Sequence, residues 1–224
     1  MFLMLGSRPD LAFAITKLSQ FSHNPGFKHW KAVQHVLRYI KGTTNLSITY
    51  GVGNKSLTNA FDLVGFCDAD WGSNRDDRKS VSGYVIIGNG GALFWQARKQ
   101  PTVAQSSVEA EYVSMSQATK DVMWWSYLLG GLGQPFPSPF MIFNDSQGAI
   151  ALVEQASNHS LCKHIDIRHH YMRDLHERGV IDYVFLATED MPADLLTKAL
   201  PRAVHWRLLS MFGLALESCG RVEI

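Results

Sequence analysis

Four acidic residues stand where predicted strands end or predicted helices begin: Asp68, Glu109, Asp145 and Asp194. Asp68 and Asp145 each follow an apolar run typical of a strand. Carboxylates gathered in one place bind hard divalent ions, Mg²⁺ or Mn²⁺, and two such ions close together hydrolyse phosphodiester bonds. Each acid also has an ordinary structural alternative as a turn residue, a helix cap or a partner of the helix dipole. Whether the four acids form one metal site or have separate structural roles therefore depends on the helices and strands that position them.

Two of these assignments have a close competitor. Asp70 would share the face of Asp68 in a continuing strand, but "WGS" after it indicates that the strand is ending, which favours Asp68. Glu111 competes with Glu109, and residues two apart on a helix point in nearly opposite directions. Because Glu109 borders the apolar stripe that includes Tyr112, we expect Glu109 to face the site and Glu111 to lie towards solvent.

The order of predicted elements supports a gathered site. Strand-like runs at 63–69, 80–88, 91–97, 140–144 and 180–187 alternate with helical stretches at 106–129, 146–155, 165–178 and 192–199. Three strands in a meander followed by helix-linked strands predict a mixed sheet with helices on its faces. The fold class is therefore α/β (α+β mixed sheet), with three antiparallel and two parallel strands. If the fourth strand lies beside the first, Asp68 and Asp145 meet at one edge of the sheet.

The chain divides into three parts. Residues 1–57 contain two predicted helices between Ser7 and Gly42 and a short strand, "LSITYG". Residues 58–200 contain the mixed sheet, and residues 201–224 form a C-terminal helix and tail. We expect the central part to be the catalytic domain and the first part to be a small helical appendage.

Composition limits the partners and the cellular compartment. The 224 residues carry a net charge of +1, so contact with nucleic acid requires a local basic patch. No run of eighteen apolar residues is present, so no membrane span or membrane partner is expected. Three widely spaced cysteines indicate a reducing compartment. We expect an intracellular protein of the cytoplasm or nucleus that is not secreted.

Five motifs together resemble the ribonuclease H domain of Ty1/copia-type retrotransposon Pol polyproteins. They are "FCDADWGSNRDDRKSVSGYVIIG", "SSVEAEYVSMSQATKDVMWW", "FNDSQGAIAL", "KHIDIRHHYMRD" and "PADLLTK". The match covers about residues 63–200 in the family's order. Residues 1–51 resemble the C-terminal end of the preceding reverse transcriptase. Because no "YxDD" polymerase motif is present, we expect a fragment of Pol that does not polymerise.

The resemblance implies a ribonuclease H-like fold and an endonuclease that hydrolyses the RNA strand of RNA–DNA hybrids. It places the catalytic, metal-binding carboxylates at Asp68, Glu109, Asp145 and Asp194, with two Mg²⁺ ions as cofactor and Mn²⁺ as an alternative. The rest of a reverse transcriptase is an expected partner. The main alternative is a catalytically inactive nucleic-acid-binding remnant with the same fold. A DNA nuclease or integrase-like enzyme and a purely structural module are two further alternatives.

Candidate contacts to the nucleic-acid strands are polar or basic residues near the predicted site: Ser107, Gln147, Arg98, Lys99 and Gln100. Lys99 has a solvated loop lysine as its structural alternative. The histidines of residues 159–170 match no zinc-binding spacing, so we expect no zinc site there.

Overall fold

The structure is a computed structural model that describes residues 1–51, 63–74, 76–134, 136–154 and 163–216. The strands are β1 (Leu46–Ile48), β2 (Val64–Asp70), β3 (Val81–Gly88), β4 (Gly91–Lys99), β5 (Phe140–Asn144), β6 (Ile181–Phe185) and β7 (Leu214–Leu216). The α-helices are α1 (Phe2–Gly6), α2 (Ala12–Ser19), α3 (Phe27–Gly42), α4 (Ser107–Gly131), α5 (Gln147–Glu154), α6 (Lys163–Glu177), α7 (Asp194–Thr197) and α8 (Arg202–Met211). Two short 3-10 helices, η1 (Pro9–Leu11) and η2 (Thr188–Asp190), complete the described elements.

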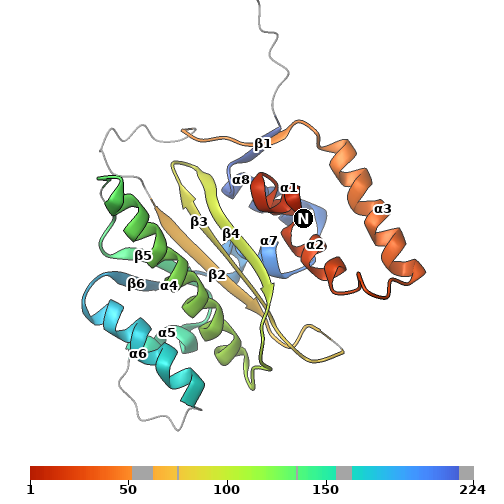
Figure 1. Ribbon diagram of the computed structural model, residues 1–224. Coiled ribbons are helices and arrows are strands. Elements are labelled where there is room, and N and C mark those ends of the chain that lie inside the picture. Colours follow the sequence, from red (N-terminus) through yellow and green to blue (C-terminus); the bar gives the residue numbers. More distant parts are fainter. Residues whose placement is uncertain (52–62, 75, 135, 155–162, 217–224) are drawn as a thin grey trace, which may run out of the picture.

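The main sheet has five strands in the order β4-β3-β2-β5-β6. β2, β3 and β4 pair antiparallel, as expected for runs joined by turns, and β5 and β6 extend the sheet in parallel through helical connections. The predicted fold class, with three antiparallel and two parallel strands flanked by helices, is confirmed (Figure 1).

The register of the central strands brings two acidic residues together. Phe66 of β2 is paired with Phe143 of β5. Both chains continue in the same direction, so two residues further on Asp68 and Asp145 reach the same edge of the sheet. On its other side, Asp68 is paired with Gly83 of β3. The fourth strand of the main sheet therefore lies beside the first, the condition under which the sequence places Asp68 and Asp145 together.

Each face of the sheet is covered by its own helices (Figure 1). Alternate strand residues point to opposite faces, so Tyr84 and Ile86 pack with α4, α5 and α6, whereas Val85 packs on the other side. The second core joins residues from both ends of the chain: Met4, Leu11, Ala12, Leu46, Leu208, Leu209, Phe212 and Leu214. The N-terminal and C-terminal segments thus close one face of the sheet together.

Contacts far apart in sequence hold this terminal cover in place. β1 pairs antiparallel with β7. Arg8 and Asp10 form a buried ion pair at 2.7 Å, and Arg8 also donates to the carbonyl and hydroxyl oxygens of Thr43 at the end of α3. The two helices expected between Ser7 and Gly42 are present as α2 and α3, whereas α1 and β7 were not predicted.

Several apolar side chains of α3 remain largely uncovered. No residue of α3 is fully buried, and Trp30 and Leu37 are 55% and 56% exposed. These side chains line an apolar groove of about 830 Å³ between α2 and α3.

The short helix α7 sits directly on the sheet because β3 has a glycine beneath it. A Cβ atom at Gly83 would lie 2.6 Å from Cγ2 of Thr197 and 2.7 Å from Cβ of Leu196. These distances are shorter than normal contacts, so only glycine allows α7 to approach this closely. Since Gly83 is the partner of Asp68, the contact places α7 beside that carboxylate.

We expect Gly83→Ala to move α7 away from β3 and to lower the free energy of unfolding by about 1–3 kcal/mol, as overpacking does. Urea unfolding followed by circular dichroism measures the change. Gly130→Ala, within helix α4 and with no atom within 4 Å of the added Cβ, is the control and is expected to be neutral or slightly stabilising. Equal effects at the two glycines would contradict the close contact.

Candidate active site

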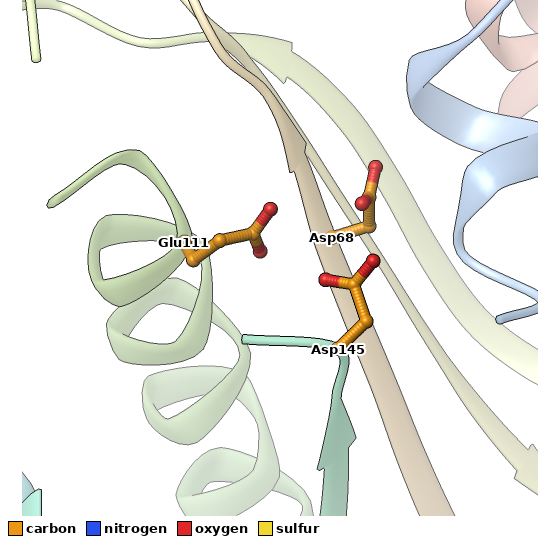
Figure 2. A group of neighbouring side chains, drawn as sticks. All are labelled: Asp68, Glu111 and Asp145. Atoms are coloured by element: carbon orange, nitrogen blue, oxygen red, sulfur yellow. The ribbon is translucent and has the colours of Figure 1, made fainter. Parts of the chain in front are cut away.

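Three carboxylates converge where β2 and β5 end. Asp68, Glu111 and Asp145 each offer an oxygen atom, and these atoms all lie within 4.8 Å of one another. Figure 2 shows Asp68 on β2, Asp145 directly after β5 and Glu111 reaching across from α4. A set of oxygen ligands of this kind suits a hard divalent cation.

Asp68 is fully buried, and both of its carboxylate oxygens have partners on or next to α7. Lys198 donates from Nζ to Oδ1 at 3.0 Å, and the Thr197 hydroxyl donates to Oδ2. On α4, the Ser114 hydroxyl donates to the backbone carbonyl of Asp68 at 2.8 Å, which ties the strand to the helix.

Glu111 is 7% exposed and is held by two hydrogen bonds. The backbone N–H of Ala69 donates to Oε1 at 3.1 Å, and the side-chain amide of Asn144 donates to Oε2 at 2.9 Å. Asn144 is itself fully buried, and its carbonyl oxygen accepts from the backbone N–H of Ser146. The last residue of β5 therefore fixes the carboxylate of α4 in place.

The other two acids lie at the rim of this arrangement. Asp145 is half-buried and accepts a hydrogen bond of 2.6 Å from the Thr188 hydroxyl. Asp194 does not belong to the three-carboxylate cluster, but Lys198 bridges it to Asp68 with an Nζ–Oδ1 distance of 2.7 Å. Asp194 therefore lies next to the cluster, with an ammonium group between the two aspartates.

Glu109 is not in this arrangement, and the expectation that Glu111 lies towards solvent is wrong. Glu109 belongs to the first turn of α4, where its backbone N–H donates to the Ser106 hydroxyl and its carboxylate accepts from the backbone N–H of Gln105. It acts as a helix cap, the structural alternative recognised in the sequence. The prediction failed because α4 is buried on more than one side: every residue from 110 to 116 is buried.

Asp70 is the last residue of β2 and is half-buried. Among the described residues it is not part of the three-carboxylate cluster, which contains Asp68. The strand does end at Asp70, as the sequence indicates.

Sequence reasoning did not single out Asn144, Ser114, Thr197 or Lys198. Two of these residues, Asn144 and Lys198, have a sequence feature that could have identified them. Asn144 is a polar residue at the end of an otherwise apolar strand, where a buried amide needs partners. Lys198 follows Asp194 by four residues, the spacing at which side chains on a helix meet.

Burial dominates the electrostatics of the cluster. It raises the pKa of Asp68 to about 6. Burial, followed by the nearby charge of Asp68, raises the pKa of Glu111 to about 8. Burial also raises the pKa of Asp194. Burial alone would lower the pKa of Lys198, but the charges of Asp68 and Asp194 outweigh it and raise the pKa. The carboxylates thus lie in a place that favours bound cations, whether protons, ammonium or metal ions.

The candidate nucleic-acid contacts differ in exposure. Ser107 and Gln147 are exposed at the first residues of α4 and α5, and Arg98 is exposed near the end of β4. Lys99 is paired with Asp77 at 2.7 Å. Gln100 is 1% exposed, and its amide donates to Ser82 and to the Ala110 carbonyl. Its side chain therefore holds the end of β4 against α4 and is not accessible to a strand.

No helix in the described part of the chain is long and apolar enough to cross a membrane. His159 and Cys162 of the histidine-rich stretch lie outside the residues that the structure describes.

The raised pKa of Glu111 predicts a pH-dependent stability of the metal-free protein. Between its ordinary value of 4.5 and about 8, the folded state keeps a proton that the unfolded state has lost. Stability is therefore lost as pH rises through this window. We expect the Tm in EDTA to fall by several degrees from about pH 5 to about pH 8, and to fall less in Glu111→Gln.

Glu109→Gln makes the same change outside the cluster and is the control, expected to keep the wild-type fall in Tm. An equal fall in wild type and Glu111→Gln would contradict the buried position of this carboxylate.

No family model matches the chain. Individual proteins of similar sequence do match it, and they show its family. The retrovirus-related Pol polyprotein from transposon TNT 1-94 of Nicotiana tabacum is 38% identical over 202 residues, which are 90% of this chain and 15% of that protein. The secreted RxLR effector protein 161 of Plasmopara viticola is 45% identical over 124 residues, 55% of this chain and 84% of that protein.

A solved structure, LC11-RNase H1 in complex with an RNA/DNA hybrid, covers 61% of this chain and 94% of its own at 13% identity, with a TM-score of 0.46. This chain spans only 15% of the length of the tobacco polyprotein, yet the match includes 90% of the residues of this chain. The chain therefore belongs to the Pol polyproteins of copia-type retrotransposons, the family that its motifs predict.

Proposed function

We propose that the chain is a metal-dependent endoribonuclease of the ribonuclease H type, which hydrolyses the RNA strand of RNA–DNA hybrids. The observation that carries this proposal is the convergence of Asp68, Glu111 and Asp145 at the ends of β2 and β5, in a segment of a retrotransposon Pol polyprotein. Pol membership alone would fit several activities, and a buried acidic cluster alone would fit several metals. Together they favour phosphodiester hydrolysis.

The residues present fit divalent metal ions. Three carboxylates with ligand oxygens within 4.8 Å of one another supply hard ligands, and Asp194 lies beside them. We assign metal binding to Asp68, Glu111, Asp145 and Asp194, with Mg²⁺ as the ion and Mn²⁺ as a substitute. When bound, two such ions activate the attacking water and stabilise the oxygen that leaves the phosphorus.

The protein's own contribution is to hold these ligands rigidly. Glu111 is fixed by Asn144 and by the backbone of Ala69, and Asp68 is fixed within β2 by its pairing with β3. Ligands held in advance need little reorganisation during the reaction, which is the main way a protein lowers such a barrier. Because Asp145 is only half-buried, it lies on the side from which a phosphate would approach.

Selection of the RNA strand would come from contacts outside the cluster. Ser107 and Gln147 begin α4 and α5, and these helix starts are adjacent, because a Cβ at Gly148 would lie 3.0 Å from Cγ2 of Val108. We assign contacts with the ribose and phosphate groups of the hybrid to Ser107 and Gln147, and phosphate contacts to Arg98 and Lys99. RNA is distinguished from DNA through its 2′-OH groups and groove shape.

The proposal extends to the protein with which this segment would work. The chain spans 15% of the tobacco Pol polyprotein, so most of such a protein lies outside it. We propose that this segment works next to a reverse transcriptase, which would supply the hybrid as its product.

The test is cleavage of a hybrid labelled on its RNA strand, with Mg²⁺ or with EDTA. We expect Mg²⁺-dependent cleavage, and a loss of at least about 100-fold in Asp145→Asn and Glu111→Gln, since each removes a charged metal ligand. Glu109→Gln is the matched control for Glu111→Gln and is expected to stay within about threefold of wild type, because a helix cap contributes only about 1 kcal/mol of stability.

Double-stranded DNA and double-stranded RNA serve as substrate controls and are expected to remain intact. Hybrid binding without cleavage, measured by fluorescence anisotropy over a range of salt concentrations, would instead support an inactive binding remnant. Cleavage that survived both Asp145→Asn and Glu111→Gln would place the activity elsewhere.

A further inference from the structure

Lys198 lies between two of the four carboxylates. Its Nζ is 3.0 Å from Oδ1 of Asp68 and 2.7 Å from Oδ1 of Asp194. The side chains of the two aspartates are 1% and 11% exposed, whereas that of Lys198 is 31% exposed. The ammonium therefore neutralises two nearly buried charges, while the lysine side chain keeps some access to solvent.

The local fold imposes this bridge. α7 is only four residues long, and Lys198 directly follows it, four residues after Asp194. Thr197 packs over Gly83 and binds the other oxygen of Asp68. The same short segment thus supplies both an acid and the cation that pairs with it.

The bridge conflicts with full occupancy of a two-ion site. Asp145 and Glu111 form a group with Asp68 whose ligand oxygens lie within 4.8 Å of one another, and Asp194 is not part of that group. A second divalent ion shared by Asp68 and Asp194 would need the oxygens that the ammonium now contacts. Two positive charges at such short distances repel by several kcal/mol even at the effective dielectric constant of a protein surface, about 20. The ammonium and the second ion therefore exclude each other.

We propose that Lys198 holds the place of the second divalent ion, keeps Asp68 and Asp194 paired when that ion is absent, and must swing out for it to bind. This inference rests on the proposed two-ion site. Lys198 acts as a positioning residue that weakens binding of the second ion more than that of the first. The site would then hold one ion readily and take the second only at higher concentration.

The test is Mn²⁺ binding to the intact chain, without nucleic acid, measured by calorimetry and by the paramagnetic resonance signal of free Mn²⁺. We expect two binding steps in wild type, with the second weaker. In Lys198→Met the second step tightens by at least about tenfold, because a competing charge is removed, and the first tightens by a clearly smaller factor. Lys198→Arg keeps a cation at this position and is expected to keep the second step weak.

Two further variants sharpen the result. Asp194→Asn removes a ligand of the second ion only, so the second step should be lost and the first retained. Arg178→Met breaks an exposed pair with Asp174 at the same four-residue spacing, and both binding steps should be unchanged.

Thermal unfolding provides an independent readout. In EDTA, Lys198→Met should have a lower Tm than wild type, because Asp68 and Asp194 lose their counter-charge, and Mn²⁺ should raise its Tm by more than it raises that of wild type. If Lys198→Met does not fold in EDTA, Lys198→Gln replaces it with the same expected results.

Two outcomes would overturn the proposal: an unchanged or weaker second step in a folded Lys198→Met, or an equally tight second step in Lys198→Arg. These outcomes are separable from failure of the nuclease proposal, because no substrate is involved. A wild type that never cleaves a hybrid, with a second step that tightens in Lys198→Met, would leave the inference standing alone.

Discussion

The parallel pairing of β2 with β5 is the constraint on which the site depends. It brings two strands that are far apart in sequence side by side, so that Asp68 and Asp145, each two residues beyond the Phe66–Phe143 pair, lie at one edge of the sheet. Ligands commonly bind at the carboxyl ends of neighbouring parallel strands. The chain turns away from the sheet after each strand there, and a crevice remains between the two connections. The long helix α4 then needs to supply only one further carboxylate, Glu111.

Collecting these acids has an energetic cost that the fold offsets locally. Burying a carboxylate without partners is strongly unfavourable, and like charges side by side add to the cost. The backbone N–H of Ala69 and the amide of Asn144 reduce it for Glu111, while Thr197 and Lys198 reduce it for Asp68. The cluster therefore remains a place where the burial of like charges costs stability, and these contacts only reduce that cost.

Apolar runs, turns and connection lengths predicted the three antiparallel and two parallel strands, but the sequence left open whether the fourth strand lies beside the first. It was insufficient for the helix, since the choice between Glu109 and Glu111 assumed a single buried stripe, whereas α4 is buried all round from 110 to 116. Lys198 depends on how closely α7 approaches Gly83, a packing detail with no sequence period. The three-residue strand β7 was missed because its partner lies at the other end of the chain.

The shared cover formed by the two ends of the chain limits how the protein can be shortened. A version reduced to residues 63–200 would keep all four carboxylates and Lys198, yet it would lose the side chains that pack over Val85, Ala92, Leu195 and Leu196. Contiguous apolar surface of this kind promotes aggregation. The smallest well-folded version should therefore retain both terminal segments, even though the described residues of neither segment supply a carboxylate to the cluster.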